Sequence, residues 1–454
     1  MSLIGLDIGT TTICGVLYSR TERSIIHVLN QHNAFIASPT GEYLQDPESI
    51  VNKVQAILDE LIDISVDRIE GISLSAQMHG ILYVDKEGQA VSPYYTWQNQ
   101  RGLIKAGKAT LEDVLSELLD YPVYTGYGIV THYSLFTDNS IPPSARFFCN
   151  IGDYVSMTLS GRAVPLTDIT IGHSMGICTV LSGQQPKNLN LLGSECIAYI
   201  PEVVSTEKHL GEYRGIPVIQ AIGDNQASFL GSVREKESSL LLNYGTAGQM
   251  SFYSKWCENY SGFDTRPLGN EGYIHVAYSL CGGNSYTILA RFFEETASLF
   301  SSGSILDPIT IMDEMSLDLS IEDIDCMPLF LGQRGGKDNY GYLKNITEAN
   351  FTPRHLLTAI VQGMVKELYQ HYEELPDSVK TRITTLIGAG NGIRRNRHLQ
   401  NAVKMRFGKP VSLVNHTEES CLGAVINAGK GTGIYVDYRE GTAEIISCYK
   451  DVVQ

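Results

Sequence analysis

LIGLDIGTTTICGVLYS, residues 3–19, consists of two apolar runs separated by an acid, a glycine and three threonines. The runs are rich in apolar and β-branched residues, which predicts two strands joined by a turn. Gly9 permits close approach of the backbone to a ligand, and the threonine amides and hydroxyls can donate hydrogen bonds to phosphate oxygens. Asp7 would repel a phosphate, so we expect it to hold Mg²⁺ through water. Alone, the stretch fits a phosphate site and a plain hairpin turn about equally well.

The residues that follow alternate between helix and strand patterns. Asp46 and Pro47 predict a helix start, and apolar residues recur at helical spacing as far as Leu61. GISLS, residues 71–75, then returns to strand character. This alternation predicts an α/β fold.

A second stretch, LLLNYGTAGQMSFYS at residues 240–254, repeats the pattern of the first. Its turn contains Gly245 and Thr246, and Gly245 lies 236 residues after Gly9. The repetition predicts two domains of related topology, each presenting one phosphate-binding turn.

The length of the chain also favours two domains. A chain of 454 residues exceeds the size of most single cores. The polar stretch at residues 232–238 interrupts the apolar pattern. We therefore expect an N-terminal domain at 1–234 and a C-terminal domain at 235–454.

Charge and cysteine usage exclude several classes of protein. A net charge of -16 argues against binding to nucleic acid or to an anionic membrane. The nine cysteines show no CxxC pair and no Cys/His cluster of metal spacing, which predicts free thiols in a reducing compartment. The sequence contains no leader pattern and no apolar run of about 18 residues. We expect a cytoplasmic protein.

AIGDNQASFLG, residues 221–231, places Asp224 after an apolar strand and before a predicted helix. A carboxylate there can cap the helix. It can also accept the proton of a hydroxyl that attacks phosphorus. The neighbouring Asn225 is a neutral hydrogen-bonding group of the kind that recognises polyols.

Two further stretches suggest a carbohydrate. SAQMHG brings Gln77, Met78 and His79 to a tight connection between strands, and YYTWQNQR supplies Trp97 among amide side chains. Sugar C–H faces pack on aromatic rings, while sugar hydroxyls need directional partners. The histidine could instead be a structural hydrogen-bonding group, and the tryptophan could belong to a core.

GAGNGIRRN, residues 388–396, follows an apolar strand and precedes a helix. It lacks the lysine and spacing of a Walker A loop. Its place at a strand end predicts contacts with adenine or ribose.

Taken in order, DIGTTT, NYGTAG, GDNQAS and GAGNGIRRN resemble the motifs of the FGGY family of carbohydrate kinases. The resemblance covers nearly the whole chain. It implies two actin-like ATPase domains of the ribonuclease H-like fold, with ATP, Mg²⁺ and the sugar in a cleft between them. A small-molecule sugar is the implied partner, and a homodimer is the oligomeric state that the family suggests.

The resemblance also implies roles for individual residues. Asp224 would be the general base, and it would share the metal with Asp7. The implied nucleotide-binding residues are Thr10, Thr11, Thr12, Gly245, Thr246, Gly283, Gly390, Asn391 and Arg394. The implied sugar-binding residues are Gln77, Met78, His79, Trp97, His132, Asp153, Asp224 and Asn225.

The acceptor is the least determined part of the prediction. QMHG is similar to the corresponding segment of xylulose and sedoheptulose kinases, and TGYGIVTHYS and SLCGGN look closer to sedoheptulokinases. We therefore expect phosphorylation of the terminal primary hydroxyl of a ketose, with sedoheptulose preferred to xylulose. An actin-like chaperone and a sugar sensor that has lost catalysis are the alternatives from other classes.

Overall fold

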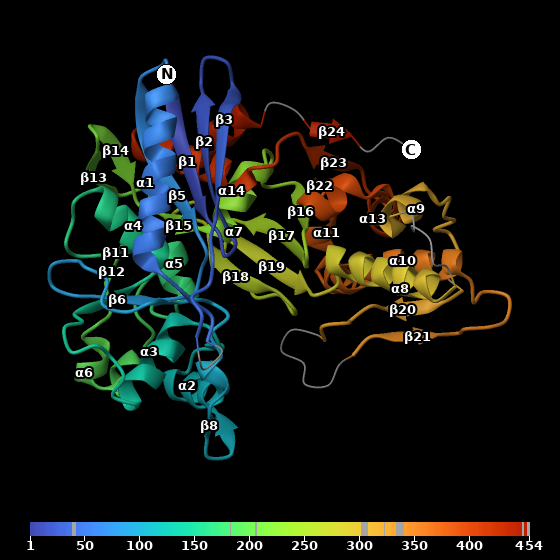
Figure 1. The fold of residues 1–454 in the computed structure, drawn as a ribbon, viewed down its shortest axis with the longest axis horizontal. Helices are drawn as coiled ribbons and strands as arrows, with labels where there is room; N and C mark the ends of the chain where they lie inside the picture. Colours follow the sequence, from blue (N-terminus) through green and yellow to red (C-terminus); the bar gives the residue numbers. More distant parts are fainter. Residues whose placement is uncertain are drawn as a thin grey trace. The chain divides into compact units, whose positions relative to one another are not determined.

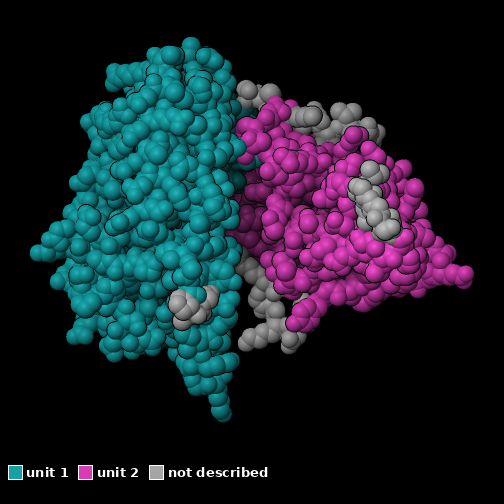
Figure 2. Space-filling model, in the orientation of Figure 1, with its two compact units in different colours: residues 1–234, 266–273, 418–447 teal, residues 235–265, 274–417, 448–454 magenta. Residues whose placement is uncertain are grey.

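The computed structural model describes residues 1–38, 42–181, 183–204, 207–300, 307–321, 323–332, 340–446 and 449–451. For residues 450 and 451 it describes the backbone alone. It divides into two compact units (Figure 2). Unit 1 contains Met1–Arg234, Arg266–Tyr273 and Glu418–Ser447, and unit 2 contains the remaining segments. The predicted boundary after residue 234 coincides with the first change of unit. Two later segments nevertheless return to unit 1, so the units are not two continuous halves of the chain.

Unit 1 is built on a sheet with the order β13-β14-β5-β1-β2-β3, in which β15 also pairs with β5 (Figure 1). Its strands are β1 Ser2–Ile8, β2 Thr12–Ser19, β3 Ser24–His32, β5 Ile69–Ala76, β13 His209–Tyr213, β14 Ile216–Ile219 and β15 Ile222–Gly223. The first three strands form an antiparallel meander, while β5 runs parallel to β1, β14 and β15. The hairpin predicted from the opening stretch is therefore confirmed.

The remaining elements of unit 1 are its helices and its short strands. The helices are α1 Pro47–Ile64, α2 Leu111–Leu119, α3 Gly128–Thr137, α4 Ile151–Leu159, α5 Ile169–Ser174, α6 Ser194–Ile197, α7 Asp224–Ser232, α14 Glu419–Gly431 and α15 Tyr438–Ile445, with short 3-10 turns at Arg101–Leu103 and Leu189–Leu192. The short strands are β4 Leu44–Gln45, β6 Leu82–Val84, β7 Tyr94–Tyr95, β8 Lys105–Ala106, β9 Ala109–Thr110, β10 Phe147–Cys149, β11 Leu166–Asp168 and β12 Glu202–Val204. The predicted helix after Asp46 is confirmed as α1, and Asp46 caps it by accepting from the amides of Glu48 and Ser49.

Helices α1 and α14 cover opposite faces of the unit 1 sheet. A Cβ added to Gly15 on β2 would meet Ile57 of α1, whereas one added to Gly5 on β1 would lie 2.0 Å from the carbonyl oxygen of Cys421 in α14. Gly15 is paired with Leu6 of β1, so Leu6 lies on the α1 face. Neighbouring residues of a strand point to opposite faces, so Gly5 and Asp7, on either side of Leu6, both lie on the α14 face. In Figure 1 the red helix α14 accordingly lies beside the blue strands from the other end of the chain.

Unit 2 repeats this arrangement around a sheet with the order β18-β19-β17-β16-β22-β23-β24. Its strands are β16 Ser239–Tyr244, β17 Gly248–Ser254, β18 Asp264–Pro267, β19 Tyr273–Ser279, β20 Asp325–Met327, β21 Tyr342–Lys344, β22 Thr385–Ala389, β23 Val411–Val414 and β24 Tyr449–Asp451. The last two residues of β18 and the first of β19 belong to the segment that is part of unit 1. Its helices are α8 Gly283–Phe300, α9 Pro308–Glu314, α10 Pro353–Glu373, α11 Asp377–Arg382, α12 Asn391–Arg395 and α13 Arg397–Phe407. As in unit 1, an antiparallel hairpin is flanked by a parallel strand, here β22 beside β16. The predicted repetition of topology is confirmed.

Each unit has its own apolar core. The core of unit 1 includes apolar residues of the meander, of α1 and of α4. The core of unit 2 centres on β16, α10 and α13. Among the residues described, none of the helices combines the length and the apolar character that crossing a membrane requires.

Candidate active site

Two carboxylates of unit 1 lie at the ends of neighbouring parallel strands. In the register of the sheet, Ser75 of β5 is paired with Asp7 of β1 on one side and with Ile222 of β15 on the other. Asp224 follows β15 directly as the first residue of α7. The Ser75 hydroxyl donates to Asp7 Oδ1 at 2.7 Å. Because the carboxyl ends of parallel strands meet at one edge of a sheet, Asp7 and Asp224 share that edge.

The electrostatic field at this edge is acidic. Burial raises the pKa of Asp7 to about 7, and the charges of Asp224, Glu418 and Glu419 add to that effect, while the hydrogen bond from Ser75 opposes it. Burial likewise raises the pKa of Asp224 to about 6, while the charge of Arg266 and hydrogen bonds from backbone amides oppose that rise. Several carboxylates in a desolvated place favour binding of a divalent cation, and carboxylate oxygens are the ligands that Mg²⁺ prefers. The donor set therefore fits Mg²⁺.

The threonine turn between β1 and β2 is held by side chains from other elements. The amide of Gly9 donates to the carbonyl of Thr12 at 3.0 Å and closes the turn. Gln45 Nε2 donates to the carbonyl of Thr10 at 2.7 Å, and Trp97 Nε1 donates to the Thr10 hydroxyl at 3.0 Å. The side chains of Thr11 and Thr12 are exposed. The turn is thus fixed at Thr10 while its tip faces solvent, as a phosphate-binding turn requires.

Gln77 supports this turn from its buried side. Its side chain is buried, its Oε1 accepts from the Thr10 hydroxyl at 3.2 Å, and its Nε2 donates to Gln45 at 2.8 Å. Both ends of the Gln77 amide are therefore engaged with protein groups. The structure places Gln77 as a positioning residue, and its predicted contact with sugar has no support here.

Trp97 presents an indole surface beside the same turn. Its side chain is 45% exposed although its ring nitrogen is bound to Thr10. Such an indole can stack on a sugar face without losing its hydrogen bond. The predicted role of Trp97 is compatible with this geometry.

Met78 and His79 lie at the connection after β5. The His79 backbone has a φ of 74°, which is rare for a residue with a side chain. Its amide donates to the Ser174 hydroxyl at 3.1 Å, and its Nδ1 lies 2.7 Å from the Ser174 carbonyl. A carbonyl only accepts, so Nδ1 carries the proton. The imidazole also stacks on Tyr127, with the ring centroids 4.7 Å apart.

Arg266 is a buried cation beside these residues, and no sequence motif indicated it. Its side chain is 4% exposed, and its Nη1 donates to Met78 Sδ at 3.3 Å. The next residue, Pro267, accepts a hydrogen bond of 3.0 Å from Gln226 in α7. Arg266 belongs to a segment that returns to unit 1 after the chain has entered unit 2, and sequence order alone does not reveal such a return.

The start of α7 is fixed by a chain of hydrogen bonds from the junction of β11 and α5. The amide of Gly223 donates to Thr170 Oγ1 at 2.9 Å, and the Thr170 hydroxyl donates in turn to the buried Asp168 carboxylate. A Cβ added to Gly423 of α14 would lie 1.9 Å from the carbonyl oxygen of Ala227 in α7, so these two helices are in very close contact. Asp224 is therefore mounted on a rigid support.

Two of the predicted sugar-binding residues are core residues instead. His132 is completely buried, and its two ring nitrogens lie 2.8 Å from the Tyr83 hydroxyl and 2.9 Å from the Cys196 carbonyl. Burial lowers the pKa of His132 to about 4, so it is neutral. We correct the prediction for His132, because no ring nitrogen is left for a sugar.

Asp153 also has a structural role. It is 1% exposed and accepts hydrogen bonds from the amide of Asn150, the hydroxyl of Thr167 and the amide group of Gln220. Together with Asn150 it forms the capping box of α4. We therefore remove Asp153 from the site as well.

The predicted nucleotide-binding residues of unit 2 converge on one edge of its sheet. The amide of Gly283, at the start of α8, donates to the carbonyl of Gly245 at 2.8 Å, and the amide of Asn284 donates to the carbonyl of Thr246 at 3.1 Å. Gly390 has a φ of 82°, and a Cβ there would lie 2.6 Å from the carbonyl oxygen of Tyr244. Three glycine-containing turns thus lie against one another beside the start of an 18-residue helix, where amide groups can bind phosphate.

Asn391 and Arg394 flank these turns on the short helix α12. Arg394 Nη1 donates to Asn391 Oδ1 at 3.1 Å, and its Nη2 donates to the His416 carbonyl at 2.8 Å. Arg394 is half-buried and Asn391 is exposed. Their predicted contacts with a nucleotide stay predictions.

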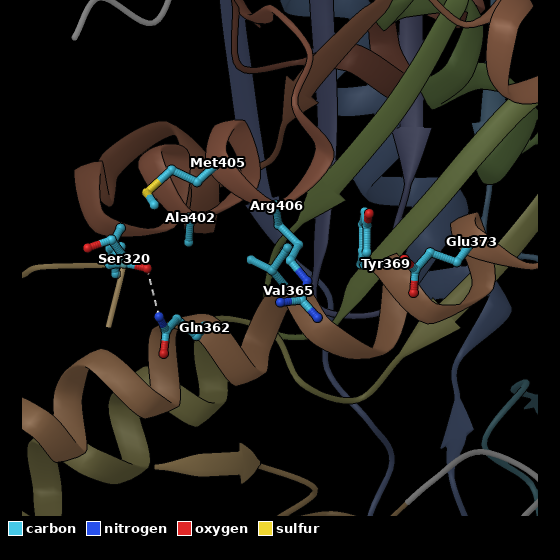
Figure 3. Close-up of a pocket in the computed structure, with 9 residues that line it drawn as sticks. Ser320, Gln362, Val365, Tyr369, Glu373, Ala402, Met405 and Arg406 are labelled. Atoms are coloured by element: carbon cyan, nitrogen blue, oxygen red, sulfur yellow. Dashed lines mark hydrogen bonds between the residues drawn. The ribbon is translucent and has the colours of Figure 1, made fainter. Parts of the chain in front are cut away.

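Unit 2 also contains a cavity of about 470 Å³ between α10 and α13 (Figure 3). Gln362 in its wall donates to the Leu319 carbonyl at 2.8 Å, and the Arg406 guanidinium lies over the Tyr369 ring at 4.9 Å. None of the predicted site residues lines this cavity. We do not assign the active site to it.

Comparison with known proteins decides the family. Residues 2–231 match the model of the N-terminal domain of the FGGY family of carbohydrate kinases. The chain belongs to the FGGY family of carbohydrate kinases. The protein is therefore a sugar kinase, as its motifs predicted.

Individual relatives of this FGGY kinase are similar over almost their whole length. Mouse (Mus musculus) sedoheptulokinase is 24% identical and covers 96% of this chain and 97% of its own. The crystal structure of xylulose kinase from Rhodospirillum rubrum has a TM-score of 0.84 at 19% identity and covers 99% and 93% of the two chains. The Plasmodium falciparum glycerol kinase structure with ADP has a TM-score of 0.81 at 16% identity, with coverage of 98% and 92%. These structures confirm the predicted α/β fold with actin-like ATPase domains.

Proposed function

We propose that this kinase transfers the terminal phosphoryl group of ATP to the terminal primary hydroxyl of a ketose, with sedoheptulose as the preferred acceptor. The observation that carries the proposal is the pair of carboxylates, Asp7 and Asp224, on the sheet edge beside the threonine turn. The sugar preference is supported by the QMHG segment and by the likeness to mouse sedoheptulokinase.

Asp224 would act as the general base. The acceptor hydroxyl oxygen forms a bond to the terminal phosphorus, the bond from that phosphorus to the bridging oxygen of ADP breaks, and the hydroxyl proton passes to the Asp224 carboxylate. Above about pH 6 the Asp224 carboxyl is ionised and can accept this proton. A positioned base of this kind contributes roughly a hundredfold to ten-thousandfold to a rate.

The other residues of unit 1 would orient the reactants. The threonine turn would donate hydrogen bonds to phosphate oxygens, while Trp97, His79 and Asn225 would hold the sugar. Bound Mg²⁺ would neutralise charge on the phosphate oxygens, and Asp7 with Asp224 would hold it there. In unit 2, the turns at Gly245, Gly283 and Gly390 would bind the nucleotide.

Part of the proposal concerns the cellular setting. We place the kinase in the cytoplasm, where ATP is available. We also propose a homodimer, because the family resemblance suggests this oligomeric state. Analytical ultracentrifugation of the purified chain tests the dimer, and a single sedimenting species of about 50 kDa would exclude it.

The test of the acceptor is a coupled ADP-release assay that compares kcat/KM for sedoheptulose, xylulose, ribulose, fructose, glycerol and gluconate. We expect the highest value for sedoheptulose, at least about tenfold above xylulose, because hydroxyl contacts discriminate strongly between sugars. A higher value for xylulose would make xylulokinase the function. Calorimetric binding of a sugar without any phosphorylated product would instead identify an inactive sugar sensor.

A further inference from the structure

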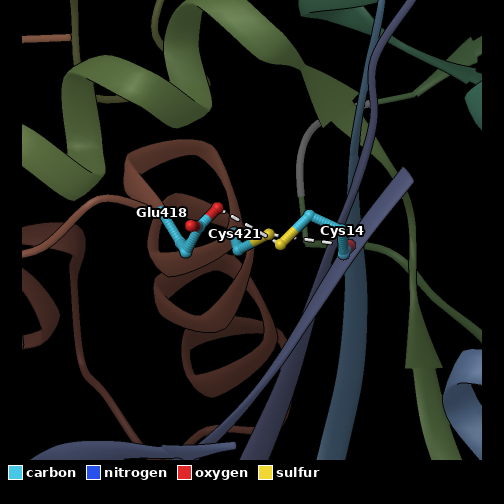
Figure 4. A group of neighbouring side chains, drawn as sticks. All are labelled: Cys14, Glu418 and Cys421. Atoms are coloured by element: carbon cyan, nitrogen blue, oxygen red, sulfur yellow. Dashed lines mark hydrogen bonds between the residues drawn. The ribbon is translucent and has the colours of Figure 1, made fainter. Parts of the chain in front are cut away.

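Two thiols and a carboxylate come together on the α14 face of the unit 1 sheet. Cys14 of β2, Cys421 of α14 and Glu418, which directly precedes α14, each offer a ligand atom, and these three atoms all lie within 4.8 Å of one another (Figure 4). Cys14 Sγ donates to Glu418 Oε2 at 3.2 Å. Cys14 is 6% exposed and Cys421 is 1% exposed. The two cysteines are more than 400 residues apart in the sequence, so no spacing motif could indicate the group.

The group is held rigidly. The helix that carries Cys421 is in such close contact with β1 that a Cβ on Gly5 would lie 2.0 Å from the Cys421 carbonyl oxygen. Cys421 Sγ also lies 3.6 Å from the carbonyl oxygen of Cys14. Both cysteines thus sit on a strand and a helix whose backbones are in close contact, so the two sulfur donors are preorganised.

The group adjoins the proposed Mg²⁺ ligands. In the β1/β2 ladder Cys14 is paired directly with Asp7. Directly opposed residues of an antiparallel pair point to the same face and lie about 5 Å apart. Asp7 therefore stands next to the thiol pair, and it also feels the charge of Glu418.

We propose that Cys14, Glu418 and Cys421 form a binding site for a thiophilic divalent cation of the Zn²⁺ type. Cysteine sulfur is the ligand that distinguishes Zn²⁺ from Mg²⁺, and Zn²⁺ also accepts carboxylate oxygen as a ligand. With metal–sulfur distances of about 2.3 Å and metal–oxygen distances of about 2.0 Å, neighbouring donors of a tetrahedral site lie roughly 3.5 Å apart. The distance from Cys14 Sγ to Glu418 Oε2, 3.2 Å, is close to that spacing, and the other two separations are at most 4.8 Å. Water or Asp7 would complete the coordination.

A cation at this site would interfere with the reaction. It would attract Asp7 and compete with Mg²⁺ for its carboxylate, so Zn²⁺ would inhibit the enzyme. This consequence rests on the proposed kinase function, whereas binding of the cation does not. The binding experiment therefore uses a spectroscopic signal rather than activity.

The test is titration of the reduced, metal-free full-length protein with Co²⁺, which replaces Zn²⁺ and gives a sulfur-to-metal charge-transfer band. All proteins carry Cys257→Ser, because Cys257 is the half-exposed thiol among the described cysteines. We expect one Co²⁺ per chain with this band, displacement by Zn²⁺, and at least tenfold weaker binding in Cys14→Ser and in Cys421→Ser. Cys178→Ser removes a buried thiol outside the group and should bind Co²⁺ as the parent does.

X-ray absorption of the parent protein with one Zn²⁺ provides a second measurement that needs no substitution in the group. Two sulfur scatterers at about 2.3 Å support the proposal. A shell of oxygen and nitrogen alone overturns it, as does a charge-transfer band that persists in the double variant Cys14→Ser/Cys421→Ser. Formation of a Cys14–Cys421 disulfide by a protein whose reduced form binds no Co²⁺ would also overturn it and would identify a redox pair.

Discussion

At the scale of single residues, the roles proposed for Asp224 and Asp7 require both buried carboxyls to be ionised. Burial raises the pKa of both carboxyls, and Arg266 and the Ser75 hydroxyl each oppose that rise for one of them. Arg266 is buried against Met78, so its charge acts through a medium that screens poorly. The pKa of Asp224, the base of the proposed mechanism, therefore lies about one unit below neutral pH.

The first prediction concerns the acid limb of activity. The measurement is made at saturating Mg²⁺, which favours the ionised form of Asp7. Because the Asp224 carboxyl must be ionised to accept a proton and its pKa is about 6, kcat/KM should then fall about tenfold per pH unit below pH 6. Removing the charge in Arg266→Gln should raise the pKa and move this limb to higher pH by about one unit. Arg266→Lys keeps the charge and should move it less. A limb at the same pH in Arg266→Gln and in the parent would refute the assigned role of Arg266.

A second prediction separates the role of Asp7 from that of the base. Asp7→Asn should raise the Mg²⁺ concentration needed for half-maximal activity by about tenfold or more, because a carboxylate ligand is lost. The KM for the sugar should change little. Ser75→Ala removes only the 2.7 Å hydrogen bond to Asp7 and should give a smaller shift of the same sign. Titration of activity with Mg²⁺ measures both, and an unaltered Mg²⁺ requirement in Asp7→Asn would count against the metal role.

At the scale of elements, α7 is the part whose placement matters most, since it begins with Asp224. Asp168 at the end of β11 and Thr170 in α5 hold the start of α7, and α14 contacts its side at Gly423. These supports come from segments on both sides of α7 in the sequence. Each of them can be removed separately.

Thr170→Val tests the support at the helix entry. The variant loses the hydroxyl that accepts from the Gly223 amide and leaves Asp168 without its hydroxyl donor. We expect kcat to fall about tenfold or more with little change in the KM for ATP, because a small displacement of a base is costly. Thr170→Ser retains the hydroxyl and should restore activity. Equal losses in the valine and serine variants would mean that the hydroxyl is unimportant.

The contact between α7 and α14 predicts an effect on stability. In Gly423→Ala the new methyl group would lie 1.9 Å from the backbone oxygen of Ala227, so the helices must separate. We expect a loss of about 2 kcal/mol in the free energy of unfolding of unit 1, measured by urea denaturation. Ser420→Ala on the same helix is the control and should stay within about 0.5 kcal/mol of the parent. A Gly423→Ala protein as stable as this control would contradict the close packing.

At the scale of the whole molecule, the sequence predicted the features that depend on local pattern. The hairpin around the threonine turn, its repetition near Gly245 and the strand ends that carry Asp7 and Asp224 all follow from apolar runs interrupted by turn residues. Long helices such as α1 follow from periodicity and capping.

The features that depend on distant segments could not be predicted from local pattern. Arg266–Tyr273 and Glu418–Ser447 return to unit 1, and these returns place Arg266 beside Met78 and Cys421 beside Cys14. His132 fits a polar site by residue type, but only the structure shows that it lies in an aromatic core with both nitrogens engaged.

The most direct test of the account is the turnover number of Asp224→Asn, measured with the sugar that gives the highest kcat/KM. We predict a loss of roughly a thousandfold in kcat, with thermal stability and ATP binding close to those of the parent. Asp85→Asn, a change in a turn outside the site, should retain full activity. Near-parental turnover in Asp224→Asn would contradict the central claim that Asp224 is the base of this sugar kinase.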